Sequence, residues 1–171
     1  AGNYKASLER MKGQYQSQVD KKDMSTLYEM FPKGGSYNHA WNAPNTILSK
    51  YIAGVRPTKK GWSEFEIVPE LLHFKNIKKT IPTVKGNIKL EINARDSQYQ
   101  LKLTSPNETE AIIGIPKADK KIETVFINEN LVWTKGKLKK KVKHIQFETE
   151  DDTFVKFRIP SGDWKIIAIY K

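Results

Sequence analysis

The stretch NIKLEINARDSQYQLKL, from Asn87 to Leu103, decides the fold class of this chain. Its apolar side chains recur at every second position, namely at Ile88, Leu90, Ile92, Tyr99, Leu101 and Leu103. A period of two is typical of a β-strand with one buried face. The residues between Ile92 and Tyr99 include Asp96 and Ser97, which favour turns. We therefore interpret the stretch as two strands joined by a turn.

The same alternation continues on both sides of this stretch, from Trp62 almost to the C-terminus. Further segments of this kind are Ile112–Ile115, Val125–Ile127, Leu131–Trp133, Phe154–Ile159 and Trp164–Tyr170. Roughly nine or ten short strands with no helix between them predict a closed antiparallel sheet structure. We expect residues 57–171 to form a mainly β domain, an antiparallel, jelly-roll-like β-sandwich.

The first part of the chain has a helical period instead. Leu8, Met11, Tyr15 and Val19 recur at steps of three and four, and a second stripe runs from Ile47 to Val55. We expect helices over Tyr4–Asp20 and Pro44–Gly54, with Pro57 preventing any continuation of the second. Two helices with apolar stripes cannot form a domain of their own. We therefore expect part of the first stripe to be uncovered or to contact helices outside these 171 residues.

Composition limits the function classes only loosely. The hydrophobic content of 38% and the charged content of 29% are those of a soluble globular protein. There is no cysteine, so disulfides, thiolate metal sites and cysteine nucleophiles are excluded. The net charge of +11 makes nucleic acid a candidate partner, but the excess is spread along the chain. No apolar run is long enough for a membrane span, no signal segment opens the chain, and the compartment stays open.

The segment TLYEMFPKGGSYNHAW, from Thr26 to Trp41, is unusual for a connection between helices. It combines a carboxylate, Glu29, with a glycine-rich turn and the pair Asn38–His39. Taken alone, a glutamate after two apolar residues is most often a solvated residue at a helix start. A histidine near a tryptophan is likewise more often structural than a ligand.

The order of several motifs resembles the C-terminal part of bacterial α-L-rhamnosidases of glycoside hydrolase family 78. The motifs are T-L-Y-E at Thr26–Glu29, G-S-Y-N-H at Gly35–His39, A-G-V-R-P at Ala53–Pro57, G-W-S-E-F-E-I-V-P at Gly61–Pro69 and P-T-V-K-G-N-I at Pro82–Ile88. The resemblance covers approximately Met24–Pro116 and is strongest from Thr26 to Pro69. In that family an (α/α)6 barrel precedes a β-sandwich. The resemblance thus implies that residues 1–56 are the last helices of an incomplete barrel, two or three in number.

The resemblance also implies roles for individual residues. Glu29 stands where the family has the general base of an inverting hydrolysis, and His39 stands where the family contacts the sugar. Tyr28, Asn38 and Trp41 are supporting candidates: Tyr28 replaces the family's usual tryptophan and would hold Glu29 rigid. Asn38 would brace the loop, and Trp41 would stack on sugar or belong to the core. The expected substrate is a glycoside or polysaccharide with terminal α-L-rhamnosyl residues.

A general base alone does not make an inverting glycosidase, which also needs a general acid on the other face of the sugar. In the family this acid is a glutamate well upstream, and nothing here matches it. We therefore expect the missing upstream catalytic domain to supply it and the isolated chain to be inactive.

Two other function classes remain open on sequence grounds. One is a non-catalytic carbohydrate-binding β-sandwich using Trp62, Trp133 or Trp164. The other is a basic nucleic-acid-binding domain using the run KGKLKKKVKH, Lys135–His144. That run has little aromatic interleaving, so a solvated hairpin is the better interpretation. The histidines His73 and His144 show no ligand spacing, and we predict neither a metal nor a cofactor.

Overall fold

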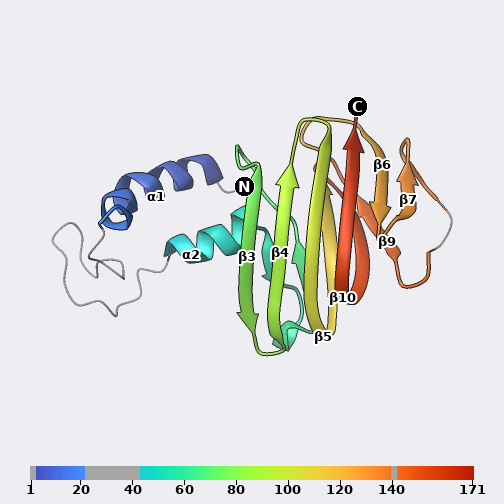
Figure 1. Ribbon diagram of the computed structural model, residues 1–171, viewed down its shortest axis with the longest axis horizontal. Helices are drawn as coiled ribbons and strands as arrows, with labels where there is room; N and C mark the ends of the chain where they lie inside the picture. Colours follow the sequence, from blue (N-terminus) through green and yellow to red (C-terminus); the bar gives the residue numbers. More distant parts are fainter. Residues whose placement is uncertain (1–2, 22–42, 140–141) are drawn as a thin grey trace.

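The computed structural model describes residues 3–21, 43–139 and 142–171. Two helical segments precede the strands and lie at one side of the sheets (Figure 1). Helix α1 spans Tyr4–Val19, and α2 (Ala43–Ile47) continues directly into η1 (Leu48–Ile52), a π-helical segment. Both predicted helices are thus confirmed, with ends that differ by one or two residues. The Asn3 side chain caps α1 by accepting a hydrogen bond of 3.1 Å from the Ala6 amide.

The apolar stripe of α1 is covered unevenly. Leu8 is buried, Met11 and Tyr15 are half-buried, and Val19 is 67% exposed. The structure therefore agrees with the expectation that part of this face lies open within the chain.

Ten strands follow among the described residues (Figure 1). They are β1 (Val55–Pro57), β2 (Glu64–Ile67), β3 (Asn76–Thr83), β4 (Gly86–Ala94), β5 (Gln98–Pro116), β6 (Ile122–Ile127), β7 (Asn130–Thr134), β8 (Lys137–Leu138), β9 (Gln146–Glu150) and β10 (Phe154–Tyr170). A short 3-10 turn, η2 (Lys60–Trp62), lies between β1 and β2. The prediction of a mainly β fold preceded by helices is confirmed.

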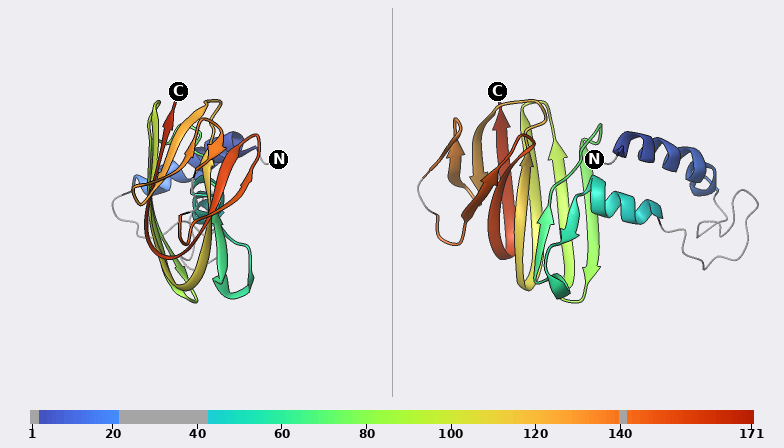
Figure 2. Two further views of the ribbon diagram at one scale, coloured as in Figure 1. Left: turned by 90° about the vertical axis from the view of Figure 1, so that its right-hand side faces the viewer. Right: turned by 180° about the vertical axis from the view of Figure 1, so that it is seen from behind.

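The strands form two layers that face each other (Figure 2). The β4 layer has the order β3–β4–β5–β10–β6–β7–β8, and uses residues 98–105 of β5 and 162–170 of β10. The β2 layer has the order β1–β2–β5–β10–β9, and uses residues 110–116 of β5 and 154–160 of β10. The two long strands therefore belong to both layers.

The passage between the layers is a bend shared by β5 and β10. Their register shifts between Pro160 and Gly162, and on β5 Glu108 has a positive φ of 58°. Bulges and bends of this kind let one strand switch sheets at the corner of a sandwich. The alternating segments counted separately in the sequence, Tyr99–Leu103 with Ile112–Ile115 and Phe154–Ile159 with Trp164–Tyr170, are thus two long strands instead of four short ones.

One strand pair departs from the predicted antiparallel pattern. β2 runs parallel to β5, with Phe65 opposite Ala111 and Ile67 opposite Ile113. A tight hairpin enforces antiparallel pairing only between strands that are neighbours in sequence. Since β3 and β4 lie between β2 and β5, no hairpin fixes the direction of this pair.

The core lies between the two layers. The inward side chains of both layers are buried, and large ones among them include Trp133, Tyr99, Phe65 and Phe157. Burying an apolar side chain of this size contributes roughly 1.5–3 kcal/mol to folding, so the alternation seen in the sequence is also the main source of stability.

Candidate functional site

The residues predicted to act on sugar, Tyr28, Glu29, Asn38, His39 and Trp41, lie outside the described residues. Their roles therefore stay predictions. The structure does describe the element that follows them, α2 with η1, and shows how this element is attached to the sandwich (Figure 1).

Helix η1 is joined to the residues that follow β2 mainly by main-chain hydrogen bonds. Ile52 and Ala53 are buried, and the Ala53 amide donates to the Leu48 carbonyl at 2.8 Å. The Val68 amide donates to the Gly54 carbonyl at 3.0 Å, and the Glu70 amide donates to the Tyr51 carbonyl at 3.2 Å. The last two of these bonds join the end of the helix to the residues that directly follow β2.

Gly54 is required at this junction for two separate reasons. Its φ is +72°, which side chains other than glycine adopt only with strain. A Cβ at this position would also lie 2.2 Å from both the carbonyl carbon and the carbonyl oxygen of Val68.

At the other end of the helix, the Lys79 ammonium donates to the Asn45 side-chain oxygen at 2.5 Å, which links α2 to β3. The element after the predicted site is thus held at both ends.

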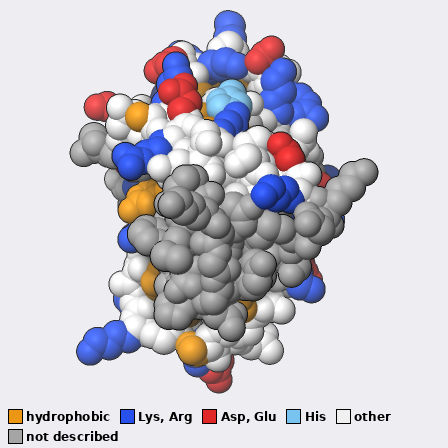
Figure 3. Space-filling model, turned by 90° about the vertical axis from the view of Figure 1, so that its left-hand side faces the viewer, with side chains coloured by type: hydrophobic (Ala, Val, Ile, Leu, Met, Phe, Trp, Pro, Cys, Tyr) orange, Lys and Arg blue, Asp and Glu red, His pale blue; other side chains and the backbone are white. Residues whose placement is uncertain are grey.

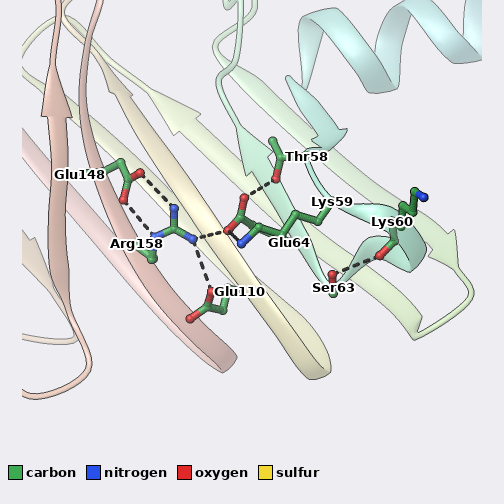
Figure 4. A network of polar contacts seen from close by, with 8 residues as sticks. All are labelled: Thr58, Lys59, Lys60, Ser63, Glu64, Glu110, Glu148 and Arg158. Atoms are coloured by element: carbon green, nitrogen blue, oxygen red, sulfur yellow. Dashed lines mark hydrogen bonds and ion pairs between the residues drawn. The ribbon is translucent and has the colours of Figure 1, made fainter.

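A polar network covers the outer face of the β2 layer (Figure 4). At its centre the Arg158 guanidinium on β10 donates two hydrogen bonds, of 2.9 and 3.0 Å, to the Glu148 carboxylate on β9. The same guanidinium donates to Glu64 on β2 and, at 3.4 Å, to Glu110 on β5. Four strands are therefore tied together by one arginine.

The Glu64 carboxylate is buried and accepts further bonds from Lys59 at 2.7 Å and from Thr58 at 2.8 Å. The Lys59 and Arg158 hydrogen bonds lower the pKa of Glu64 to about 2. Arg158 lowers the pKa of Glu148 in the same way, and these two carboxylates raise the pKa of Arg158. A carboxylate that stays ionised at neutral pH cannot donate a proton to a leaving group. We interpret this network as structural.

Sequence reasoning did not identify this network. The only signal was Arg158 itself, a charged residue between the apolar residues Phe157 and Ile159. Its partners come from distant strands, so the register of the sheet is needed to find them.

The acidic segment Glu148–Asp152 forms the end of β9 and the turn into β10, as expected of a hairpin. In the structure Glu148 pairs with Arg158, Glu150 with Lys117 at 2.8 Å, and Asp151 with Lys156 at 3.2 Å.

The described surface carries several hollows, and two of them have linings that could hold a ligand. One is a groove of 510 Å³ on the outer face of the β4 layer, whose lining includes Lys78, Lys89, Glu91, Lys102, Asp163 and Lys165. The other, of 740 Å³, lies beside β7–β9 and is lined by apolar side chains such as Leu138, Phe147 and Phe157 together with His144. Neither hollow was predicted from the sequence.

The tryptophans proposed as sugar platforms are not fully exposed. Trp133 is only 3% exposed and stacks on Phe147 with a centroid distance of 5.7 Å, so it belongs to the core. Trp62 and Trp164 are half-buried, and the Trp164 indole donates to the Pro160 carbonyl at 2.9 Å. The carbohydrate-binding alternative therefore loses Trp133 as a contact.

The described residues contain no group of three or more metal-ligating side chains, and His73 and His144 are both exposed. No helix in the described part of the chain has the length and apolar character needed to cross a membrane. At the helix-bearing end of the molecule, basic and acidic side chains are mixed around the rim (Figure 3).

Comparisons with known proteins agree with the resemblance found in the sequence. Residues 54–128 match the family described as "Bacterial alpha-L-rhamnosidase C-terminal domain". A search of curated protein sequences gives no match.

Among solved structures, the α-L-rhamnosidase from Dictyoglumus thermophilum is similar over 80% of this chain, with 21% identity and a TM-score of 0.65. The Streptomyces avermitilis α-L-rhamnosidase complexed with L-rhamnose is similar over 80% of this chain, with 21% identity and a TM-score of 0.58. The match covers 14% of the first of these chains and 12% of the second. The predicted resemblance to the C-terminal part of bacterial α-L-rhamnosidases is confirmed.

Proposed function

We propose that these 171 residues are the C-terminal part of an inverting α-L-rhamnosidase, with Glu29 as its general base and His39 as a sugar ligand. The observation that carries the proposal is the family match over residues 54–128, which begins shortly after the motif segment Thr26–Trp41. In this proposal residues 1–56 belong to the catalytic barrel and residues 57–171 form the sandwich domain.

In the proposed reaction the Glu29 carboxylate takes a proton from water, and this water attacks the anomeric carbon of the rhamnosyl residue. A carboxylic acid on the opposite face of the sugar protonates the leaving oxygen. The carboxyl groups of this acid and of the base are roughly 6.5–9.5 Å apart in inverting enzymes. The glycosidic bond breaks as the new carbon–oxygen bond forms, so the product has the inverted configuration. His39 would donate a hydrogen bond to a sugar hydroxyl.

The general acid is assigned to a part of the enzyme outside this chain. Two acidic residues of the sandwich support this assignment, because Arg158 holds Glu64 and Glu148 as ionised partners. Such carboxylates lack the raised pKa that a general acid needs near neutral pH.

The sandwich itself would act as a brace for the catalytic segment. The hydrogen bonds of Gly54 and Tyr51 with Val68 and Glu70 fix the helix that directly follows the motif. Catalytic groups must be held in place by rigid surroundings, since small displacements reduce the rate strongly.

The proposal is tested by comparing the complete enzyme, expressed from the full reading frame that contains these residues, with the 171-residue chain. Proton NMR of aryl α-L-rhamnoside hydrolysis should show β-rhamnose forming first with the complete enzyme and no hydrolysis with the chain alone. His39→Ala in the complete enzyme should raise KM without unfolding the protein. Formation of α-rhamnose first, or turnover by the isolated chain, would contradict the proposal.

A further inference from the structure

The groove on the outer face of the β4 layer is built from four strands that lie side by side (Figure 1). The sheet register places Lys78, Glu91, Lys102 and Lys165 in one row across β3, β4, β5 and β10. All three lysines of this row are exposed. Neighbouring strands are about 4.8 Å apart, so the row forms a continuous polar strip across the sheet.

The pair Lys102–Lys165 is the unusual feature of this row. The two residues are direct cross-strand partners on central strands, and like charges in that position destabilise a sheet. Neither ammonium has an ion pair or hydrogen bond with any residue that the structure describes. Lysine on an edge strand such as β3 protects against aggregation, but β5 and β10 are not edges. Glu91 faces Lys102 from β4 and offsets part of this repulsion, but the neighbour of Lys165 on its other side is the neutral Asn128. An anionic ligand would balance the remaining positive charge of the pair.

The next row of the groove identifies the kind of anion. It consists of Thr80, Lys89, Thr104 and Asp163, and the Thr104 hydroxyl donates to the Asp163 carboxylate at 2.6 Å. The carboxylates of Asp163 and Glu91 beside the lysines accept hydrogen bonds from hydroxyl groups, as the threonine oxygens also do. The groove therefore fits an anion whose charges are interspersed with hydroxyl groups, as in an acidic polysaccharide.

We propose that this groove binds an acidic polysaccharide, in which uronate carboxylates contact Lys102 and Lys165 and sugar hydroxyls contact the threonine and carboxylate side chains beside them. The site would hold the polymer on the sandwich. The inference does not depend on Glu29, because binding to the sandwich can be measured without catalysis.

The experiment titrates the 171-residue chain with polygalacturonate and, separately, with its methyl ester, which has the same backbone but no charge. Lys102→Gln/Lys165→Gln is compared with a matched control, Lys137→Gln/Lys139→Gln, which removes two exposed lysines outside the groove. The groove variant should bind polygalacturonate at least about fivefold more weakly than wild type. The control should bind as wild type does, and the methyl ester should bind weakly to all three proteins.

The thermal midpoint separates binding from folding. Because the substitutions relieve a like-charge pair, the groove variant should melt at the same temperature as wild type or higher. Equal binding of polygalacturonate and its ester, or equal loss in the two variants, would overturn the proposal.

Double-stranded DNA is the third ligand. Tighter binding of DNA than of polygalacturonate, lost on Lys102→Gln/Lys165→Gln, would assign the groove to nucleic acid instead.

Discussion

The substitution Gly54→Ala tests the brace between the helix and the sandwich, and Gly61→Ala is its matched control. Both glycines have positive φ, +72° and +63°. A Cβ at Gly54 would lie 2.2 Å from the Val68 carbonyl, whereas at Gly61 no atom lies within 4 Å. Left-handed backbone alone costs about 1–2 kcal/mol in a residue with a side chain. Overpacking adds about 1–3 kcal/mol, so Gly54→Ala should lose about 3 kcal/mol.

Urea and thermal unfolding of the two variants measure the difference. For a domain of this size about 3 kcal/mol corresponds to a thermal midpoint lower by roughly 6–12 °C, against roughly 2–8 °C for Gly61→Ala. In the complete enzyme, Gly54→Ala should also lower kcat at temperatures where the variant is still folded, because the end of η1 would no longer be fixed against Val68. If the two variants were equally stable, the contact between Gly54 and Val68 would have no role as a brace.

Two further substitutions test the sandwich. The pKa of Glu64 falls from 4.5 to about 2 on folding, so ionised Glu64 stabilises the folded state by at most about 3 kcal/mol. This contribution is present above pH 4.5 and is lost as the pH falls toward 2. Glu64→Gln should therefore be less stable than wild type in urea at pH 7 and equal to it near pH 2; a constant difference would contradict the pairing with Lys59 and Arg158. The buried Tyr99 hydroxyl has no hydrogen-bond partner among the described residues, so Tyr99→Phe should leave the urea midpoint unchanged or higher, and a loss of more than about 1 kcal/mol would reveal a partner.

Local periodicity predicted most elements of the fold, but it missed β3 (Asn76–Thr83) and divided β5 and β10 into two segments each. The stripe from Ile47 to Val55 and the alternation from Ile88 to Ile92 each report which face of one segment is buried, and both are found in the structure. Periodicity does not report which segments pair. The parallel pairing of β2 with β5 and the continuity of β5 and β10 through the bend depend on contacts between distant residues.

The same limit applies to sites. Glu29 and His39 stand close together in the sequence, so an ordered motif could point to them. Lys102 and Lys165 are 63 positions apart and become neighbours only through the register of β5 and β10. Each is an ordinary outward lysine in its own strand. Only their juxtaposition in the sheet makes them candidates for ligand binding.

The proposed role of Glu29 in activating the attacking water can be measured from the rate of aryl α-L-rhamnoside hydrolysis by the complete enzyme. Glu29→Gln keeps the size and shape of the side chain and removes the base, so kcat should fall by about 10²–10⁴-fold. Glu129→Gln, the same change at an exposed position between β6 and β7, should keep the wild-type rate. A Glu29→Gln enzyme as active as Glu129→Gln would show that Glu29 is not the general base.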